Sequence, residues 1–545
     1  MQRVVLSAPR AGPARPAPRG GSSKVAEPHL LETERPLPLH DIGATRAIEA
    51  QAQAALGPNV LMQRAGLALA RLAVALAPHA RGIWVAAGPG NNGGDGLEAA
   101  MHLHRWGKRV AVSLLANDAS QPADARAALQ RARAAGAHID GGLDIGFEPD
   151  LAIDALLGVG ASRAAEGAIA ACIARLNALT CPVLAADLPS GLNADTGATL
   201  GEHCVRASHT LSLLTLKPGL FTGAGRDHCA DIWFDSLDAD ARQTAPSAWL
   251  GGAAQLIELL PARRHAQHKG SFGDVAVVGG APGMSGAALL AARAALAAGA
   301  GRVYVDLLGS MGMAHDQLCD PQRPELMLRP GWAGGDPQVL RNSLVVCGCG
   351  GGDAVREVLP RLLSHVPRLL LDADALNAIA TDTSLQAQLS ARTGRGHATL
   401  LTPHPLEAAR LLQCSAAQVQ AGRLHAAMRL AARFNCVVVL KGSGSVVSAP
   451  GRVPHINPTG NAALASAGTG DVLAGWLGGL WSQIATLRTI GAGTEEVAAE
   501  AAFDAARGAT FLHGLAAEEI HAGPLRAGDL IERMHELRRK HSPTR

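Results

Sequence analysis

The sequence predicts an α/β protein with two domains. Its 545 residues are enough for several average domains or for two large α/β domains. Hydrophobic residues make up 48% of the chain and aromatic residues only 3%, so Ala, Leu and Val must pack the core, while 63 glycines supply turns. Short apolar strands followed by glycine-rich loops and helices recur along the chain, which is the order of elements in α/β layers.

The charge and cysteine content exclude several classes of protein. The 49 basic and 46 acidic residues leave a net charge of +3, which gives no electrostatic footprint for nucleic acid or an anionic membrane. No uninterrupted apolar run reaches the roughly 18 residues that a membrane span needs. The nine cysteines have neither zinc-site spacing nor the even number of a disulfide framework. We therefore expect a cytoplasmic protein that binds any phosphate locally.

The first 35 residues are predicted to be a disordered leader. They contain four arginines between Arg3 and Arg19 together with several prolines, and they show neither helical nor strand periodicity. An Arg-rich start is also typical of an organellar transit peptide. The prolines would interrupt the amphipathic helix of such a peptide, and acidic residues follow from Glu27 onward. Disorder over residues 1–35 is therefore the expectation.

The first domain, residues 36–243, begins with two helices and a βαβ unit. The helices have apolar residues at i, i+3 and i+4 spacing, and the buried strand that follows them ends in a glycine loop, Gly88–Gly96. A glycine loop at the first turn of a βαβ unit is typical of nucleotide binding. The predicted elements are helices Asp41–Ala54 and Met62–Ala77, strand Ile83–Ala87, a helix from Leu97 and strand Val110–Leu115.

The glycine loop has a second interpretation. Its glycines fit the GxGxxG template of a nicotinamide dehydrogenase, and Asp118 lies at the distance expected of a ribose-binding acid. However, Asn91 and Asn92 offer more polar groups than a plain dinucleotide turn requires, and Asp95 would crowd a pyrophosphate. We expect the loop to hold more than phosphate, while a dehydrogenase remains an alternative.

Two later strands also end in polar loops. Strand Leu151–Ala155 runs into Asp154–Gly160, and strand Pro182–Ala186 runs into Asp187–Gly191. The carboxyl ends of parallel strands form the edge at which open α/β sheets bind ligands. Each polar residue by itself is an ordinary turn residue. Together, Asn92, Asp154 and Ser190 offer hard oxygen ligands, which suit an alkali or alkaline-earth cation rather than a transition metal.

Five motifs in this domain resemble the NAD(P)HX epimerase family, over Pro36 to about Asp240. They are MQRAG, NNGGDG, DALLGVG, DLPSGLNADTG and KPGL. The resemblance implies a Rossmann-like three-layer domain, a substrate-binding role for Asp187 and K⁺ ligands at Asn92, Asp154 and Ser190. The other implied substrate-binding residues are Asn91, Asn92, Gly93, Gly94, Asp95, Gly158, Val159, Gly160, Ala161, Ser162, Arg163 and Ala164. Leu157 and Val159 depart from the usual Phe and Thr of that loop.

The second domain is predicted to span residues 244–545. The run DADARQTAPS has no strand or helix period and marks the boundary. Strand, polar loop and helix then alternate again. The expected strands are Asp274–Val278, Leu344–Cys347, Leu369–Leu371, Thr399–Leu401 and Cys436–Leu440, which lead into the loops APGMSG, GCGGGD, DADALN, TPHPLE and KGSGS.

The stretch Ser466–Gly475 suggests phosphoryl chemistry. Its glycines remove side chains where a polyanion must approach backbone N–H groups, and the helix that follows carries partial positive charge at its N-terminus. Asp471 lies at that point, so it is suited to take a proton from a hydroxyl that attacks a phosphoryl group. The alternative is a plain N-cap. Lys441–Ser445 is either a hairpin turn or a phosphate-binding loop, and no Walker A motif is present.

With the GTGD motif, this half resembles the ribokinase-like ADP/ATP-dependent NAD(P)HX dehydratases, from about Pro246 to the C-terminal end. The resemblance implies that the hydrated substrate lies near Ala287, Gly350, His404 and Asp471. It implies that the nucleotide is bound by Lys441, Gly442, Ser443, Gly444, Ser445 and Gly470. Cys349 and Gly351 occupy places where Pro and Leu are usual.

The two halves together predict one repair pathway. The first would interconvert the R and S epimers of hydrated NADH and NADPH with K⁺ bound, with Asp187 handling the proton. The second would dehydrate the S epimer with Mg²⁺ and ADP or ATP, with Asp471 as the base. We also expect a homo-oligomer. The alternatives are a vitamin or sugar kinase, the dehydrogenase above, and a first domain that only binds nucleotide or mediates oligomerisation, with Asp187 as a structural residue.

Overall fold

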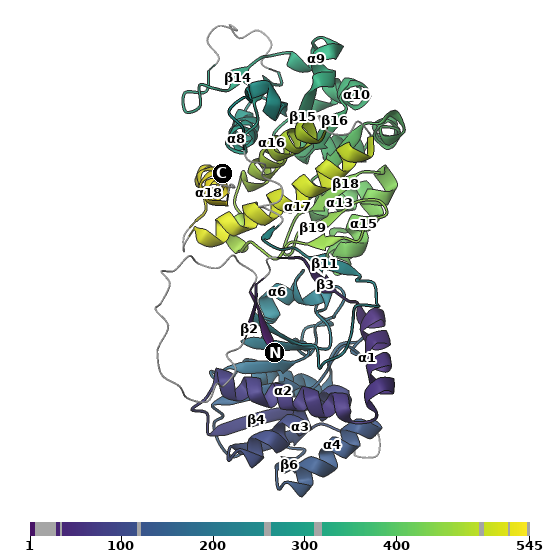
Figure 1. Ribbon diagram of the computed structural model, residues 1–545, viewed down its shortest axis with the longest axis vertical. Helices are drawn as coiled ribbons and strands as arrows, with labels where there is room; N and C mark the ends of the chain where they lie inside the picture. The colour runs from purple at the N-terminus through teal and green to yellow at the C-terminus, as the bar shows by residue number, and fades with distance from the viewer. Residues whose placement is uncertain are drawn as a thin grey trace. The chain divides into compact units, whose positions relative to one another are not determined.

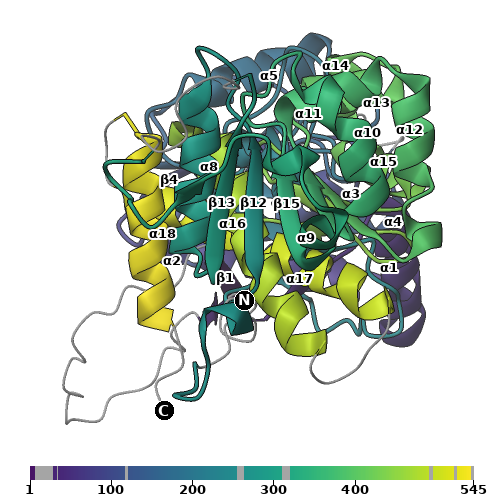
Figure 2. The same cartoon turned by 90° about the horizontal axis from the view of Figure 1, so that it is seen from above.

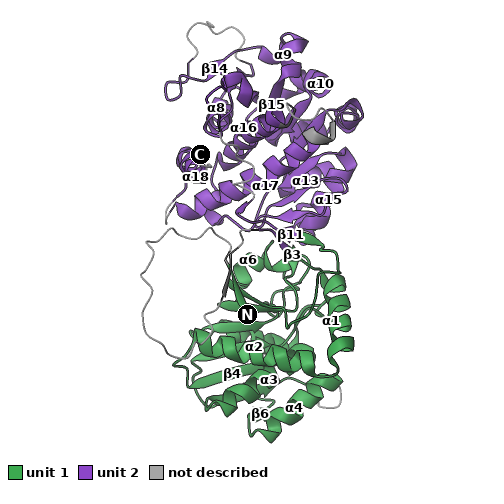
Figure 3. Cartoon of the chain, in the orientation of Figure 1, with its two compact units in different colours: residues 1–33, 38–248 green, residues 34–37, 249–545 purple. Residues whose placement is uncertain are grey.

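The computed structural model divides the chain into two compact units (Figure 3). One comprises Met1–Thr33 with Pro38–Ala248, and the other Glu34–Leu37 with Trp249–Arg545. The contact boundary at Ala248 lies five residues beyond the predicted one at residue 243. The structure describes residues 1–5, 29–32, 35–116, 121–254, 263–309, 319–489, 495–520 and 524–541. The acid Asp118 lies outside them.

The first unit is built on a largely parallel sheet with the strand order β2-β1-β10-β9-β8-β7-β4-β5-β6. Strand β4 lies between β5 and β7 and runs parallel to both. The strands are β1 (Gln2–Val5), β2 (His29–Glu32), β4 (Gly82–Ala87), β5 (Arg109–Leu114), β6 (His138–Asp140), β7 (Leu151–Ala155), β8 (Val183–Ala186), β9 (His209–Leu213) and β10 (Asp231–Asp235). The short strand β3 (Leu37–Leu39) lies where the chain divides.

Helices cover both faces of this sheet, because alternate residues of a strand point to opposite faces. In β4, Ile83 and Val85 pack with α2, α3 and α4, whereas Trp84 and Ala86 pack with α5. Figure 1 shows α2 and α3 beside β4. The result is the expected three-layer arrangement. The helices are α1 (Ile42–Leu56), α2 (Val60–Leu76), α3 (Asn91–Arg105), α4 (Ala123–Ala134), α5 (Gly167–Asn177) and α6 (Gly225–His228).

The expected disordered leader is wrong for its two ends. Strand β1 pairs antiparallel with β10 and parallel with β2, so residues 2–5 and 29–32 belong to the sheet. The free edge of β10 offers backbone N–H and C=O groups to a further strand, and a short segment of weak pattern can satisfy them. Residues 6–28 lie outside the part of the chain that the structure describes.

The glycine-rich segment forms the start of a helix rather than a loop up to Leu97. Helix α3 begins at Asn91, directly after Gly90. A Cβ added at Gly93 would lie 2.0 Å from Gly88 O, and one at Gly96 would lie 2.6 Å from the Ala155 side chain. The glycines therefore allow the first turns of α3 to pack closely on neighbouring backbone. Because glycine is a poor helix former, these residues hide the start of α3 from a prediction based on the sequence.

The second unit contains a sheet in which β14-β13-β12-β15-β16-β17-β18-β19-β20-β11 is the strand order. Its central strands, β12 to β18, are parallel, and β18, β19 and β20 pair antiparallel. The strands are β11 (Ala248–Leu250), β12 (Asp274–Gly279), β13 (Arg302–Leu307), β14 (Met327–Leu328), β15 (Ser343–Cys347), β16 (Arg368–Leu371), β17 (Ala398–Leu401), β18 (Val437–Leu440), β19 (Val446–Ser448) and β20 (His455–Ile456).

Helices again cover this sheet on two faces (Figure 2). In one core cluster, helices α10 through α15 pack against the sheet. Helix α8 packs against α16 and against strands β12 and β13. The helices are α8 (Ser285–Ala297), α9 (Pro337–Asn342), α10 (Val355–His365), α11 (Ala373–Ala380), α12 (Thr383–Ser390), α13 (Pro405–Leu412), α14 (Ala416–Ala421), α15 (Arg423–Phe434), α16 (Thr469–Thr489), α17 (Glu495–Glu519) and α18 (Ala527–His541).

The predicted strands of both domains are confirmed to within one residue at each end. All nine cysteines are free, as the sequence indicated. Within the described ranges, no single helix is long and apolar enough to cross a membrane, although the bent pair α1 and α2 together meets that length and composition.

Candidate functional sites

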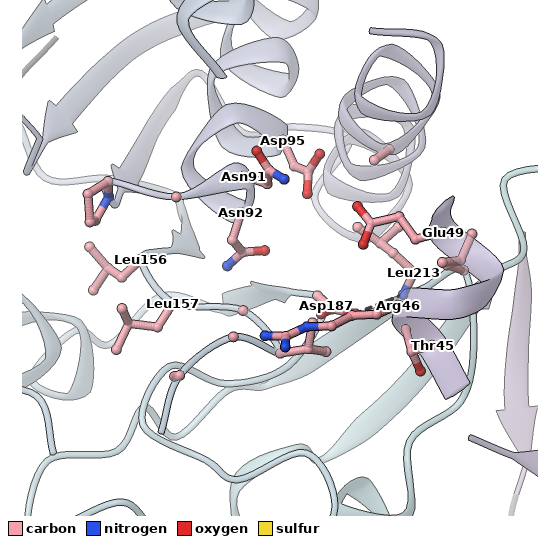
Figure 4. Close-up of a pocket in the computed structure, with 18 of the residues that line it drawn as sticks. Thr45, Arg46, Glu49, Asn91, Asn92, Asp95, Leu156, Leu157, Asp187 and Leu213 are labelled. Carbon is pink, nitrogen blue, oxygen red and sulfur yellow. Dashed lines mark hydrogen bonds between the residues drawn. The ribbon is translucent and has the colours of Figure 1, made fainter. Parts of the chain in front are cut away.

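The first unit has a pocket where its strand order reverses. From β4 the chain continues to β5 and β6 on one side, and then returns to β7, β8 and β9 on the other. Ligands bind at such a switch point in open α/β sheets, outside the carboxyl ends of the strands. A cavity of about 1010 Å³ lies there, and the segments after β4, β7 and β8 line it together with α1 (Figure 4).

The pocket brings together most of the residues predicted for the hydrated substrate. The predicted residues that line it are Asn91, Asn92, Asp95, Gly158, Val159, Gly160, Ala161, Ser162, Arg163, Ala164 and Asp187. Gly93 and Gly94 do not line it. They are buried in α3, where a Cβ on Gly94 would lie 2.6 Å from Met62 Sδ. These two glycines allow α3 to pack closely against neighbouring residues, and this packing positions Asn92 and Asp95 on either side of them.

Asp187 is held firmly at the pocket floor. It has a left-handed backbone, with φ of 66°, in the turn that ends β8. Its carboxylate accepts a hydrogen bond from the Nζ of Lys217, a side chain that is only 1% exposed. Lys217 also donates to Leu213 O over 2.7 Å. The ion pair orients Asp187 and neutralises its charge without excluding it from the pocket.

Two acids beside Asp187 have raised pKa values. Burial raises the pKa of Asp95 well above its usual range, and the nearby carboxylates of Asp187 and Glu49 raise it further. Burial also raises the pKa of Glu49, and the negative charge of Asp187 raises it further. Sequence reasoning missed Glu49 and its neighbour Arg46, which lie on α1 and not in a strand-end loop. Their spacing of three residues on one helix face is the only signal that the sequence offers.

The three predicted cation ligands lie at the same edge. Ser190 donates to Asp154 through its hydroxyl over 2.6 Å and through its N–H over 2.8 Å. Burial raises the pKa of Asp154 to about 6, because a charged carboxylate loses hydration there. Both side-chain polar atoms of Asn92 are buried without a hydrogen-bond partner. Buried amides are nearly always satisfied, so the Asn92 Oδ1 fits a cation ligand, while its Nδ2 needs an acceptor such as a substrate oxygen.

The second unit has its switch point between β12 and β15. The chain passes from β12 to β13 and β14, and then returns to β15 on the other side. Ala287 at the start of α8 and Gly350 after β15 meet there, since a Cβ added at Gly350 would lie 2.9 Å from Ala287 Cβ. Gly350 has a φ of 59°, which glycine adopts readily. The structure thus brings together these two predicted substrate residues.

Asp471 lies within the first turn of α16, which begins at Thr469. It is therefore inside the helix, and the plain N-cap interpretation is wrong. Burial raises the pKa of Asp471 to about 6, and the negative charge of Asp372 contributes. The side chains of Cys349, Asp372 and Asp471 lie within 4.8 Å of one another. A carboxylate with a pKa near neutrality at a helix N-terminus is suited to general base catalysis.

Two of the predicted nucleotide residues, Lys441 and Gly470, lie next to Asp471. Lys441–Ser445 connects the antiparallel strands β18 and β19, so it is a hairpin turn, one of its two interpretations. A Cβ added at Gly470 would lie 3.5 Å from Lys441 Nζ. Lys441 Nζ also donates to Asp372 Oδ1 over 2.7 Å. Sequence reasoning did not select Asp372, although it begins the DADALN motif.

His404 has a structural role as the N-cap of α13. Its Nδ1 accepts hydrogen bonds from the N–H groups of Leu406 and Glu407 over 3.1 and 3.2 Å, which caps α13. Its Nε2 lies 3.1 Å from Glu407 Oε1. The side chain is 45% exposed, so it is not a core residue. The cap fixes the ring at the sheet edge that carries the other predicted residues.

Comparison with known proteins identifies both halves. Residues 58–219 match the family described as YjeF-related protein N-terminus, and residues 275–537 match NAD(P)H-hydrate dehydratase. The bifunctional NAD(P)H-hydrate repair enzyme of Escherichia coli K12 is 39% identical over 438 residues, which cover 78% of this chain and 80% of that protein. The enzyme of the same description from Moorella thermoacetica is 37% identical, over 78% and 84% of the two chains.

A solved structure resembles the second half. It is the ADP/ATP-dependent NAD(P)H-hydrate dehydratase from Bacillus subtilis co-crystallised with ATP/Mg²⁺, which is 24% identical with a TM-score of 0.40 and covers 53% of this chain and 96% of that one. The expected α/β fold class is confirmed in both units, each of which has helices on both faces of a largely parallel sheet. The identity and coverage of the curated relatives show that the chain belongs to the bifunctional NAD(P)H-hydrate repair enzymes, which combine an epimerase with a dehydratase.

Proposed function

We propose that the two sites act in series on the hydrated nicotinamide ring, with Asp187 and Asp471 as their central acids. The first site interconverts the R and S epimers, and Asp187 handles the proton. This assignment is supported by a carboxylate fixed by Lys217 in a cavity of about 1010 Å³ that has room for a dinucleotide. Hydrated NADH incubated without nucleotide, followed by separation of the epimers, tests the activity.

In the second site we assign Asp471 as the base. It removes the proton of the C6 hydroxyl, and that oxygen takes the terminal phosphoryl group of the nucleotide, which enters as a Mg²⁺ complex. ATP then leaves as ADP, or ADP as AMP. The C6–O bond breaks next, phosphate departs and a C5 proton is lost, which restores the ring double bond. The helix N-terminus and the glycines before Asp471 offset the phosphoryl charge.

The closeness of Gly470, Lys441 and Asp471 supports this assignment, because a lysine and a helix N-terminus, which are suited to phosphate, lie beside a carboxylate that is suited to act as a base. Incubating S-NADHX with MgATP or MgADP and following NADH absorbance tests it. A vitamin or sugar kinase of the same fold would release a phosphorylated product and no NADH. A dehydrogenase would bind unhydrated NAD tightly, which a titration detects.

A potassium ion fits the first site. Asn92, Asp154 and Ser190 would hold it, since they provide oxygen ligands and the Asn92 amide is buried without a partner. Its charge would favour the ionised form of Asp154 and would help to hold an anionic substrate. The nine free cysteines support a reducing compartment such as the cytoplasm. A homo-oligomer stays a prediction.

Epimerisation is expected to depend on potassium. Replacing K⁺ by Na⁺ should slow it, because the smaller ion fits the same ligands poorly. Asp154→Ala should raise the K⁺ concentration needed for the half-maximal rate by roughly 10- to 100-fold. Epimer ratios followed by chromatography in KCl and NaCl at equal ionic strength measure both effects. Equal rates in the two salts, with Asp154→Ala unaffected, would remove the ion from the mechanism.

A further inference from the structure

The pocket of the first unit presents an electrostatic problem for its substrate. Its lining includes the acids Glu49, Asp95, Asp124, Glu166 and Asp187. A hydrated dinucleotide carries a pyrophosphate with two negative charges, which those of these acids that are ionised and unpaired would repel. A binding site for it therefore needs cations that are free to contact phosphate.

Three cationic residues line this pocket. Lys217 is already bound to Asp187, to Ser212 Oγ and to Leu213 O, and it is buried. Arg163 belongs to the loop already predicted to bind substrate. Arg46, on α1, has no hydrogen bond or ion pair within the described part of the chain. Its positive charge acts on Glu49, where it opposes part of the rise in pKa that burial causes.

Arg46 is directed into the pocket. Figure 4 shows its side chain extending from α1 into the cavity. A Cβ added at Gly160 would lie 3.8 Å from a terminal guanidinium nitrogen of Arg46. The guanidinium therefore lies beside the loop Gly158–Ala164, opposite Asn91 and Asn92 at the start of α3 (Figure 4).

We propose that Arg46 is a substrate-binding residue of the epimerase site whose guanidinium binds a phosphate group of the hydrated dinucleotide. The inference rests on the proposed epimerase function of this pocket. A guanidinium offers a planar fork of donors that matches phosphate oxygens in pairs. Bound phosphate would lie between Arg46, the loop Gly158–Ala164 and the N-terminus of α3, which also favours an anion. Arg46 is thus placed to position the substrate and not to transfer its proton.

The test compares Arg46→Ala with the wild-type chain in epimerisation of R-NADHX without nucleotide, measured by chromatographic separation of the epimers. Loss of a charge-assisted hydrogen bond should raise KM by roughly 10- to 100-fold, with kcat within about twofold of wild type. Arg46→Lys should recover part of this loss, because it restores the charge but not the paired geometry. Arg71→Ala, which removes an exposed arginine of α2 outside the pocket, is the matched control and should leave both constants unchanged.

Comparing hydrated NADH with hydrated NADPH shows whether Arg46 binds the pyrophosphate or the 2′-phosphate. If Arg46 binds the pyrophosphate, KM rises equally for hydrated NADH and hydrated NADPH. If it binds the 2′-phosphate, only hydrated NADPH is affected. An unchanged KM for both hydrated NADH and hydrated NADPH would overturn the inference. A fall in kcat with a shifted pH profile would also overturn it, because Arg46 would then act through Glu49 and not through phosphate. No epimerisation by the wild-type chain would instead refute the proposed function.

Discussion

Asp471→Asn is expected to reduce nucleotide-dependent dehydration of S-NADHX by roughly 10²- to 10⁴-fold, the usual contribution of a general base. The substitution removes the proton acceptor but keeps the size and polarity of the side chain. The first turn of α16 should therefore stay folded, and Lys441 and Gly470 should still meet the nucleotide. NADH absorbance gives the rate, and calorimetric titration with MgATP gives nucleotide affinity.

The matched control is Asp353→Asn in the same unit. Asp353 has a fully exposed side chain that pairs with Arg356 at 3.8 Å, so its loss should change neither rate nor affinity. A loss of tenfold or less in Asp471→Asn would be too small for a general base. Asp471 would then be a positioning residue, and another group would have to take the C6 hydroxyl proton.

The pH dependence of dehydration should follow the same carboxyl. Because burial and Asp372 raise the pKa of Asp471 to about 6, the base is protonated below that pH and ionised above it. The value of kcat/KM should therefore rise with pH through about 6 and then level off, provided that the enzyme stays folded. Rates measured with S-NADHX at constant ionic strength check this. A flat profile down to about pH 5 would show that no group of this pKa is required.

The sequence predicted the strands and strand-end loops well, because each strand is a short apolar run that is followed within a few residues by Gly, Pro or Asp. Loops at the carboxyl ends of parallel strands must share one edge, so the grouping of Asn92, Asp154 and Ser190 follows from the order of strands and loops along the chain. Residues from other elements could not be placed in this way. Glu49 and Arg46 reach the first pocket from α1, whose pattern is that of an ordinary surface helix.

The errors have physical causes. The start of α3 was missed because Gly93, Gly94 and Gly96 are poor helix formers, although close packing requires them. Strands β1 and β2 were missed because β1 pairs with β10, an edge strand formed by residues far along the chain, and β2 pairs only with β1. The pairing of Lys441 with Asp372 joins the ends of β18 and β16, which are separated by β17 in the sheet, and it could not be inferred from either motif alone.

Asp187→Ala is expected to abolish use of the R epimer while dehydration of the S epimer continues at the wild-type rate. The substitution removes the acid of the first pocket and leaves Asp471 and its neighbours untouched. Given a mixture of epimers with MgATP, over a time short relative to spontaneous epimerisation, the wild-type chain should convert nearly all of it to NADH. The variant should stop at the S fraction. Complete conversion by the variant would show that Asp187 is not essential to the epimerase.

Mixing two full-length variants tests whether the sites work independently. Asp187→Ala keeps the dehydratase site, and Asp471→Asn keeps the epimerase site, so neither alone should convert the R fraction. If the intermediate diffuses freely between sites, the mixture should resume and complete NADH formation after the Asp187→Ala reaction has stopped. Failure of Asp187→Ala on the S epimer would show that the two units are coupled. The division near residues 243–248 would then separate two folds but not two functions.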